Sequence, residues 1–327
     1  MSDNLDTGWL LLTNDDGIEA LGIQMLVEEL NSRGHKVIVF APSSNHSATG
    51  MRINLMTPIA WRFRDDLKES WNVNSKNLHL IELDGSPCDT MIVSLDKGLE
   101  QIMPNVIPRL VVSGVNLGPN MSQDSYHSGT MGAAREAGLY GMPAIASSLT
   151  SFEPEGMYEA VKATVEVIEQ SLKIIPEIPQ NLRRPSVDIS ATHLSCWPEV
   201  GITRNWKEDP IMALKNAFLD GELMLNLNTP PNWNGEFATT RLGMRWYRDA
   251  ISFDTTSNDV QTATFTIGAA SIDHTPVENS DCDAVMECKS SISCLPTWPQ
   301  THPLAIDDEL LAWNLKNSNG KFPVWMD

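Results

Sequence analysis

The chain has 327 residues, of which 42% are hydrophobic, so it can bury the core of one large domain or of a domain with an elaboration. Its formal net charge of −19 repels polyanions, which argues against binding to duplex DNA or RNA. No stretch approaches the ~20 consecutive apolar residues of a membrane span, which argues against a membrane protein.

Strand-like and helix-like segments alternate through the first half of the chain. Short apolar runs typical of buried strands are Leu10–Thr13, Lys36–Ala41, His79–Leu83, Arg109–Ser113 and Pro143–Ser148. Helical patterns lie between or after them, at Ala20–Leu30, from Ser86-Pro87 onward, at Thr130–Leu139 and at Tyr158–Ile174. This alternation predicts an α/β fold, a doubly wound, Rossmann-like parallel sheet.

The second half of the chain has a different pattern. Residues 1–185 are predicted as the Rossmann-like catalytic core, and residues 186–222 as an insertion of unclear structure. Strand-like runs return at Leu223–Asn228, Ala238–Tyr247 and Gln261–Ile267, before a short C-terminal helix. Residues 223–327 are therefore predicted as a β-rich extension and C-terminal arm. Exposed apolar strands usually find a partner, so we expect a homodimer or homotetramer.

The cysteines and the N-terminal residues indicate in which cellular compartment the protein is expected. The five cysteines form no Cys-x-x-Cys pair, which indicates neither a disulfide framework nor a zinc site. The acidic start Met1–Asp6, followed by a short apolar run, does not have the pattern of a signal peptide. We therefore expect a cytoplasmic protein.

Four polar segments follow the predicted strands or begin a helix. They are Asn14-Asp15-Asp16-Gly17, Ala41–Gly50, Ser113–Asn120 and Ser128–Ala134. In a doubly wound sheet, ligands bind beyond the carboxyl ends of the strands, so these segments can meet. Carboxylate, hydroxyl and amide oxygens suit Mg²⁺ or Mn²⁺, and a helix start offers free N–H groups to an anion. Cation and anion sites together favour phosphate ester hydrolysis. Each segment alone also fits a solvated turn or an ordinary helix cap.

The four segments, in this order, resemble those of the SurE (survival protein E) family of metal-dependent 5′/3′-nucleotidases. The match is strong from about Trp9 to Ser148 and weaker beyond it. The resemblance implies that Asp15, Asp16, Ser47 and Asn116 bind the metal, Mg²⁺ or Mn²⁺, and that Asp15 and Asp16 are catalytic. It also implies a phosphate site, formed by Asn45, Ser128, Gly129 and Thr130. The family usually has glycine where Ala48 stands.

The resemblance implies hydrolysis of nucleoside 5′- and 3′-monophosphates. The attacking group is either a water molecule oriented by an aspartate or an aspartate itself. A bulky residue at Gly129 is expected to hinder phosphate binding while leaving metal affinity nearly intact. One alternative is a non-catalytic nucleotide-binding module with a structural metal. Another is a different metal hydrolase on a similar sheet, such as a deacetylase; that chemistry normally uses histidines to bind zinc, and the sequence has no His-x-x-x-His or Asp-Asp-His grouping.

Overall fold

The computed structural model describes residues 6–71, 73–179, 205–254, 264–268, 271–318 and 322–326. Most of the predicted insertion, residues 186–204, lies outside this description. The remainder of that segment contains helix α8 (Pro210–Leu219). Among the described residues, no helix combines the length and the apolar character needed to cross a bilayer.

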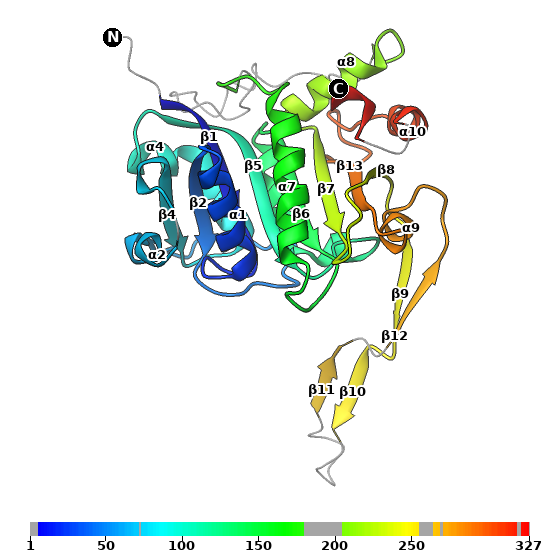
Figure 1. Ribbon diagram of the computed structural model, residues 1–327, viewed down its shortest axis with the longest axis horizontal. Helices are drawn as coiled ribbons and strands as arrows, with labels where there is room; N and C mark the ends of the chain where they lie inside the picture. Colours follow the sequence, from blue (N-terminus) through cyan, green and yellow to red (C-terminus); the bar gives the residue numbers. More distant parts are fainter. Residues whose placement is uncertain are drawn as a thin grey trace.

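A nine-stranded mixed sheet forms the centre of the molecule (Figure 1). Its strand order is β3-β4-β2-β1-β5-β6-β7-β13-β8. The pairs from β4 through β7 are parallel, whereas β3 runs antiparallel to β4 and β13 antiparallel to β7. The bounds are β1 Asp6–Thr13, β2 Lys36–Pro42, β3 Trp61–Phe63, β4 Leu78–Leu83, β5 Val106–Leu117, β6 Ala144–Leu149, β7 Leu223–Thr229, β8 Phe237–Thr240 and β13 Ser290–Pro296. The predicted α/β fold is confirmed, with a mixed rather than a fully parallel sheet.

Helices cover both faces of this sheet. Side chains alternate along a strand, so Leu10 and Leu12 of β1 join one core and Trp9 and Leu11 the other. The first core packs under α1 (Leu21–Ser32) and α7 (Met157–Leu172), which lie side by side in Figure 1. The second packs under α3 (Pro87–Val93) and α6 (Gly129–Leu139). The chain is thus wound on both faces, as the alternation predicts.

Shorter elements complete the fold. Helix α10 spans Asp308–Asn317, and the minor helices are α2 Asp65–Ser70, α4 Leu99–Ile102, α5 Asp124–His127 and α9 Asp281–Met286. Single turns occupy Ser75–Asn77, Ser94–Gly98 and Val324–Met326. At the predicted start of α3, the Ser86 side chain accepts from the Asp89 backbone, and the Asp89 carboxylate accepts from the Ser86 backbone. This reciprocal cap and Pro87 in the first turn explain where α3 begins.

The predicted C-terminal extension divides between two places. Strands β7, β8 and β13 belong to the main sheet, because β7 and β13 are buried almost throughout and pair with it on both edges. Strands β9 (Met244–Arg248) and β12 (Ser271–Thr275) pair with each other, as do β10 (Ile251–Asp254) and β11 (Thr264–Ile267). These four strands form a ribbon that projects away from the sheet (Figure 1).

The single strand predicted over Ala238–Tyr247 is wrong. The segment between β8 and β9 is bonded elsewhere: the Arg241 N–H donates to the Asn279 carbonyl, and the Gly243 N–H donates to Asp281. These bonds end the pairing of β8 with the sheet and redirect the chain into the ribbon.

Candidate functional site

The four polar segments meet at the carboxyl edge of the main sheet. Asp15 and Asp16 follow β1, Ser47 lies in the loop after β2, and Asn116 is near the end of β5. The start of α6 approaches from the second core: a Cβ atom at position 129 would lie 2.8 Å from the Cβ atom of Asp15. A cavity of about 210 Å³ opens here. Its lining residues are Asp15, Ser47, Ala48, Asn116, Leu117, Gly118, Pro119, Asn120, Asp124, His127, Ser128, Phe152 and Tyr247.

The hydrogen bonds of the two aspartates leave oxygen atoms available to a cation. Thr130 donates its hydroxyl hydrogen to Oδ1 of Asp15 at 2.6 Å, and the backbone N–H groups of Thr130 and Asp15 also interact with this carboxylate. A carboxylate has about four acceptor sites, so it keeps capacity for a cation. The Leu117 backbone N–H donates to Oδ2 of Asp16 at 3.1 Å. Oδ1 of Asp16 has only a long contact, 3.4 Å, with the Asn45 amide.

Two neutral residues, Asn116 and Ser47, also keep an oxygen atom outside the hydrogen bonds described for them. The Asn116 amide nitrogen donates to the Gly118 carbonyl at 2.8 Å, which leaves its Oδ1 atom. The Ser47 backbone N–H donates to Oδ1 of Asn45 at 2.8 Å, and the hydroxyl of Ser47 stays outside that bond. Two carboxylates, one amide and one hydroxyl therefore offer oxygen, the donor type that Mg²⁺ and Mn²⁺ prefer. This donor set fits the predicted metal.

Burial makes the negative charge at this edge costly. Asp15 is only 3% exposed, and burial raises the pKa of its carboxyl from 3.8 to about 6. The hydrogen bond from Thr130 opposes this rise, and the neighbouring charge of Asp16 adds to it. Burial also raises the pKa of Asp16, against the opposing bond from Leu117. A divalent cation between these carboxylates would offset both effects.

One residue in the loop that carries Ser47 has a left-handed backbone conformation. Ala48 has φ of +57°, a conformation in which glycine is favoured. That backbone requirement explains why the resemblance leads us to expect glycine at this place. The sequence departs from the family pattern here, but the chain still makes the turn.

The residues predicted to bind phosphate form hydrogen bonds within the protein. Ser128 caps α6, since its hydroxyl accepts from the Met131 N–H at 3.0 Å, and it also lines the cavity. Thr130 is fully buried and its hydroxyl is bound to Asp15, so its side chain positions a carboxylate. Asn45 is exposed and bridges Ser47 and Asp16. Binding of phosphate by these residues and by Gly129 stays a prediction.

The expectation that a larger residue at Gly129 spares metal affinity does not fit the geometry. An added Cβ atom would lie 2.8 Å from the Cβ atom of Asp15 and 3.0 Å from its Oδ2. Contacts this close force Asp15 to move. A substitution at Gly129 should therefore disturb the metal ligand as well as the phosphate site.

Four lining residues lie outside the polar segments predicted from sequence: Asp124, His127, Phe152 and Tyr247. His127 directly precedes Ser128 and was the only one with a sequence signal, its place in the motif. Phe152 lies in the loop after β6 and Tyr247 in the ribbon strand β9. Their approach to Asp15 depends on tertiary structure, so no local pattern could indicate it.

Two polar residues of the second half of the chain, Asp281 and His274, have structural roles. Asp281, at the start of α9, is buried and accepts from the backbones of Ser122 and Gly243 at 3.1 and 2.8 Å. His274 pairs with Asp283 at 2.7 Å. Neither residue lines the cavity. Asn120 also has a structural role: its side-chain amide donates to the Ser148 hydroxyl, and its backbone N–H donates to Oδ1 of Asn228.

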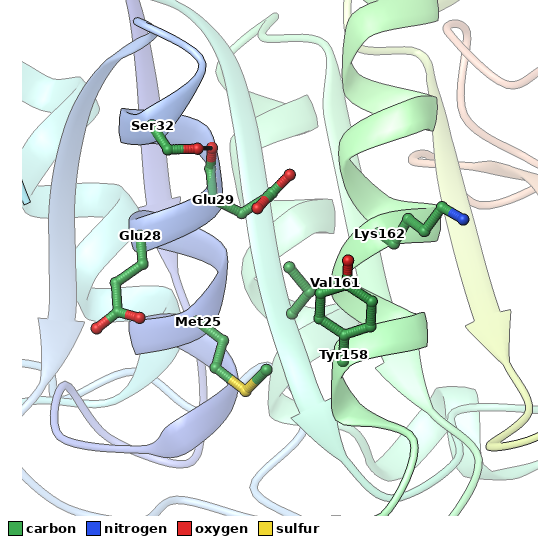
Figure 2. Close-up of a pocket in the computed structure, with 7 residues that line it drawn as sticks. All are labelled: Met25, Glu28, Glu29, Ser32, Tyr158, Val161 and Lys162. Atoms are coloured by element: carbon green, nitrogen blue, oxygen red, sulfur yellow. Dashed lines mark hydrogen bonds between the residues drawn. The ribbon is translucent and has the colours of Figure 1, made fainter. Parts of the chain in front are cut away.

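A second depression, of about 270 Å³, lies between α1 and α7 (Figure 2). The charged groups along it have partners: Glu29 binds Arg33, Glu28 accepts from Gln24, and Lys162 extends over the Trp233 ring. This depression is larger than the cavity at Asp15 but contains none of the predicted site residues. The chemistry therefore points to the smaller cavity.

The sequence profile of the family described as "Survival protein SurE" matches residues 10–249. The chain belongs to the SurE family. A protein of Prochlorococcus marinus (strain MIT 9211), named "5′-nucleotidase SurE", is 30% identical over 250 residues, which cover 74% of this chain and 71% of that protein. A namesake from Caldanaerobacter subterraneus subsp. tengcongensis is 38% identical over 167 residues, 50% of this chain and 60% of that protein. The solved structure of the SurE protein from Aquifex aeolicus has a TM-score of 0.62 and 24% identity, and covers 90% of this chain and 95% of its own.

The structure also bears on the zinc alternative. In the described part of the chain, no group of three or more His, Cys, Asp or Glu side chains is placed to hold a metal ion together. Catalytic zinc sites normally combine three such side chains. The oxygen-rich set at Asp15 suits a harder cation.

Proposed function

We propose that this SurE-family protein is a metal-dependent phosphomonoesterase that hydrolyses nucleoside 5′- and 3′-monophosphates. The observation that carries the proposal is the set of available oxygen atoms on Asp15, Asp16, Ser47 and Asn116 beside the start of α6. The curated relatives, named 5′-nucleotidases, support the substrate class.

Each group then has a role that its position allows. Asp15, Asp16, Ser47 and Asn116 would hold Mg²⁺ or Mn²⁺, which would supply charge stabilisation to the phosphoryl group and a lowered pKa to a water molecule. Asp15 or Asp16 would orient the attacking water or attack phosphorus itself. The start of α6, with Ser128 at its cap, lies beside Asp15, so the positive end of its helix dipole would stabilise the developing negative charge of the phosphoryl oxygens.

The deciding experiment measures phosphate release from 5′-AMP and 3′-AMP. The purified protein is tested with excess Mn²⁺ or Mg²⁺, then with chelator, then with the cation restored. Release that depends on the cation supports the proposal. An Asp96→Asn variant serves as control, since Asp96 is an exposed aspartate outside the site. Metal-dependent AMP binding without phosphate release would favour the non-catalytic module instead.

We also propose that the ribbon brings copies of the chain together as a homodimer or homotetramer. Its outer strands carry large exposed apolar side chains: Ile251, Phe253, Phe265 and Ile267 are 43–85% exposed. Phe253 and Phe265 face each other across the strand pair, with ring centroids 4.9 Å apart. Contiguous apolar surface of this kind is usually covered in an assembly.

A further inference from the structure

Two aromatic side chains share the cavity with the oxygen donors. Phe152 comes from the loop between β6 and α7, and Tyr247 from the ribbon strand β9. Because they are apolar and planar, they suit the flat part of a ligand rather than a phosphate or a cation. The same cavity thus combines groups for a charged end with groups for a ring.

The ring of Tyr247 is held in place by polar partners. Its hydroxyl donates to Oδ1 of Asp124 at 2.5 Å, and the Arg245 guanidinium carbon lies 5.8 Å from the ring centroid. Arg245 in turn lies 3.6 Å from the other oxygen of Asp124. Asp124 begins the short helix α5, whose first carbonyl accepts from the Ser128 N–H at 3.1 Å. The aromatic ring is therefore tied to the segment that begins the predicted phosphate site.

Phe152 lies against the loop that carries Asn116. A Cβ atom at position 118 would lie 3.1 Å from Cε1 of Phe152, so the glycine makes room for the ring. Gly118 also has φ of +131°, a conformation that disfavours other residues. Phe152 as a whole is nevertheless 69% exposed, so it has free surface that a ligand can cover.

We infer that Phe152 and Tyr247 bind the nucleobase by stacking and so determine the preference for nucleotides over other phosphate esters. This inference rests on the proposed function and names the part of the site that recognises the substrate. The cavity of about 210 Å³ is smaller than the ~300 Å³ or more of typical enclosed ligand sites, so part of a nucleotide lies at the rim. The exposed ring of Phe152 is at that rim. Stacking tolerates any base, because each base has an aromatic face.

The test compares AMP with ribose 5-phosphate, which has the same phosphate and sugar but no base. Phe152→Ala should raise KM for AMP on the order of tenfold, since loss of one base–aromatic stack weakens binding to about that degree. Its kcat for AMP and its KM for ribose 5-phosphate should stay within about twofold of wild type. Phe152→Trp should restore the KM for AMP. Equal effects on both substrates, or no effect on AMP, would overturn the inference.

Tyr247 is tested in parallel, with its neighbour as a control. Tyr247→Phe keeps the ring and should keep most of the preference for AMP, whereas Tyr247→Leu should lose it. Trp246→Ala is the matched control, because side chains alternate along β9 and Trp246 faces the other side. Thermal melting of each variant checks that the ribbon remains folded.

Calorimetric titration separates this inference from the proposed function. If wild type releases no phosphate from either compound, the nucleotidase proposal fails. Stacking is then judged from binding: tighter binding of AMP than of ribose 5-phosphate, reduced by Phe152→Ala, still supports it. Equal affinity of wild type for the two compounds overturns it.

Discussion

Replacing Asp15 by asparagine should change how stability depends on pH as well as activity. In the metal-free protein, the pKa of this buried carboxyl is about 6, against 3.8 when it is free. The folded state therefore binds the proton more tightly, and the carboxyl contributes stability below pH 3.8 that is lost as pH rises through about 6. The difference corresponds to roughly 3 kcal/mol of unfolding free energy at pH 7. The asparagine of the Asp15→Asn variant does not ionise, so the variant should not lose this stability as pH rises.

The assay is thermal melting in chelator between pH 4 and pH 7. Over this range the melting temperature of wild type should fall by roughly 3–4 °C more than that of the variant. Contributions from Asp16, Asp124 and Asp281, whose pKa values are also raised by burial, are common to both proteins and largely cancel. Because the two pH dependences are compared, any pH-independent effect of the asparagine side chain on stability also cancels.

Added Mn²⁺ supplies the second half of the test. At pH 7 it should raise the melting temperature of wild type, because a ligand that binds the folded state stabilises it, and raise that of Asp15→Asn much less. Turnover of AMP should fall on the order of 10²-fold or more. Parallel pH profiles for the two proteins in chelator would refute the assignment of a buried, charged Asp15. An unchanged response to Mn²⁺ would refute its role as a ligand.

Three further variants test single contacts. Thr130→Val removes the hydroxyl that donates to Asp15, so the pKa of that carboxyl should rise. Mn²⁺ affinity measured by calorimetry should therefore fall more at pH 6.5 than at pH 8.5. Thr130→Ser keeps the hydroxyl and should behave like wild type. Gly129→Ala places a methyl group 2.8 Å from the Asp15 side chain and should weaken both Mn²⁺ affinity and AMP turnover; loss of turnover alone would show that Asp15 has not moved. Phe253→Ser combined with Phe265→Ser should shift the assembly toward the monomer of 36.2 kDa in sedimentation, and a wild type already monomeric at assay concentration would contradict the proposed association.

The sequence was sufficient to predict most elements of the core. Buried strands such as Leu10–Thr13 and helices such as Tyr158–Ile174 have strong periodicity, and local propensity and burial pattern decide them. The convergence of Asp15, Ser47 and Asn116 followed as well, because parallel strands joined by helices bring their carboxyl ends to one edge. The capped start of α3 was visible in Ser86-Pro87 for the same local reason.

Only the tertiary structure decided which strands join the main sheet and which side chains complete the site. β7 pairs with β6 across more than 70 residues of chain, and β13 then adds antiparallel to β7; no local pattern encodes such pairing. The bond from Thr130 to Asp15 spans 115 residues, so a residue predicted to bind phosphate also holds a predicted metal ligand. Phe152 and Tyr247 reach the cavity through a loop and a ribbon, whose directions are set by packing and by buried anchors such as Asp281. Local sequence determined the elements, whereas contacts distant along the chain determined how they meet.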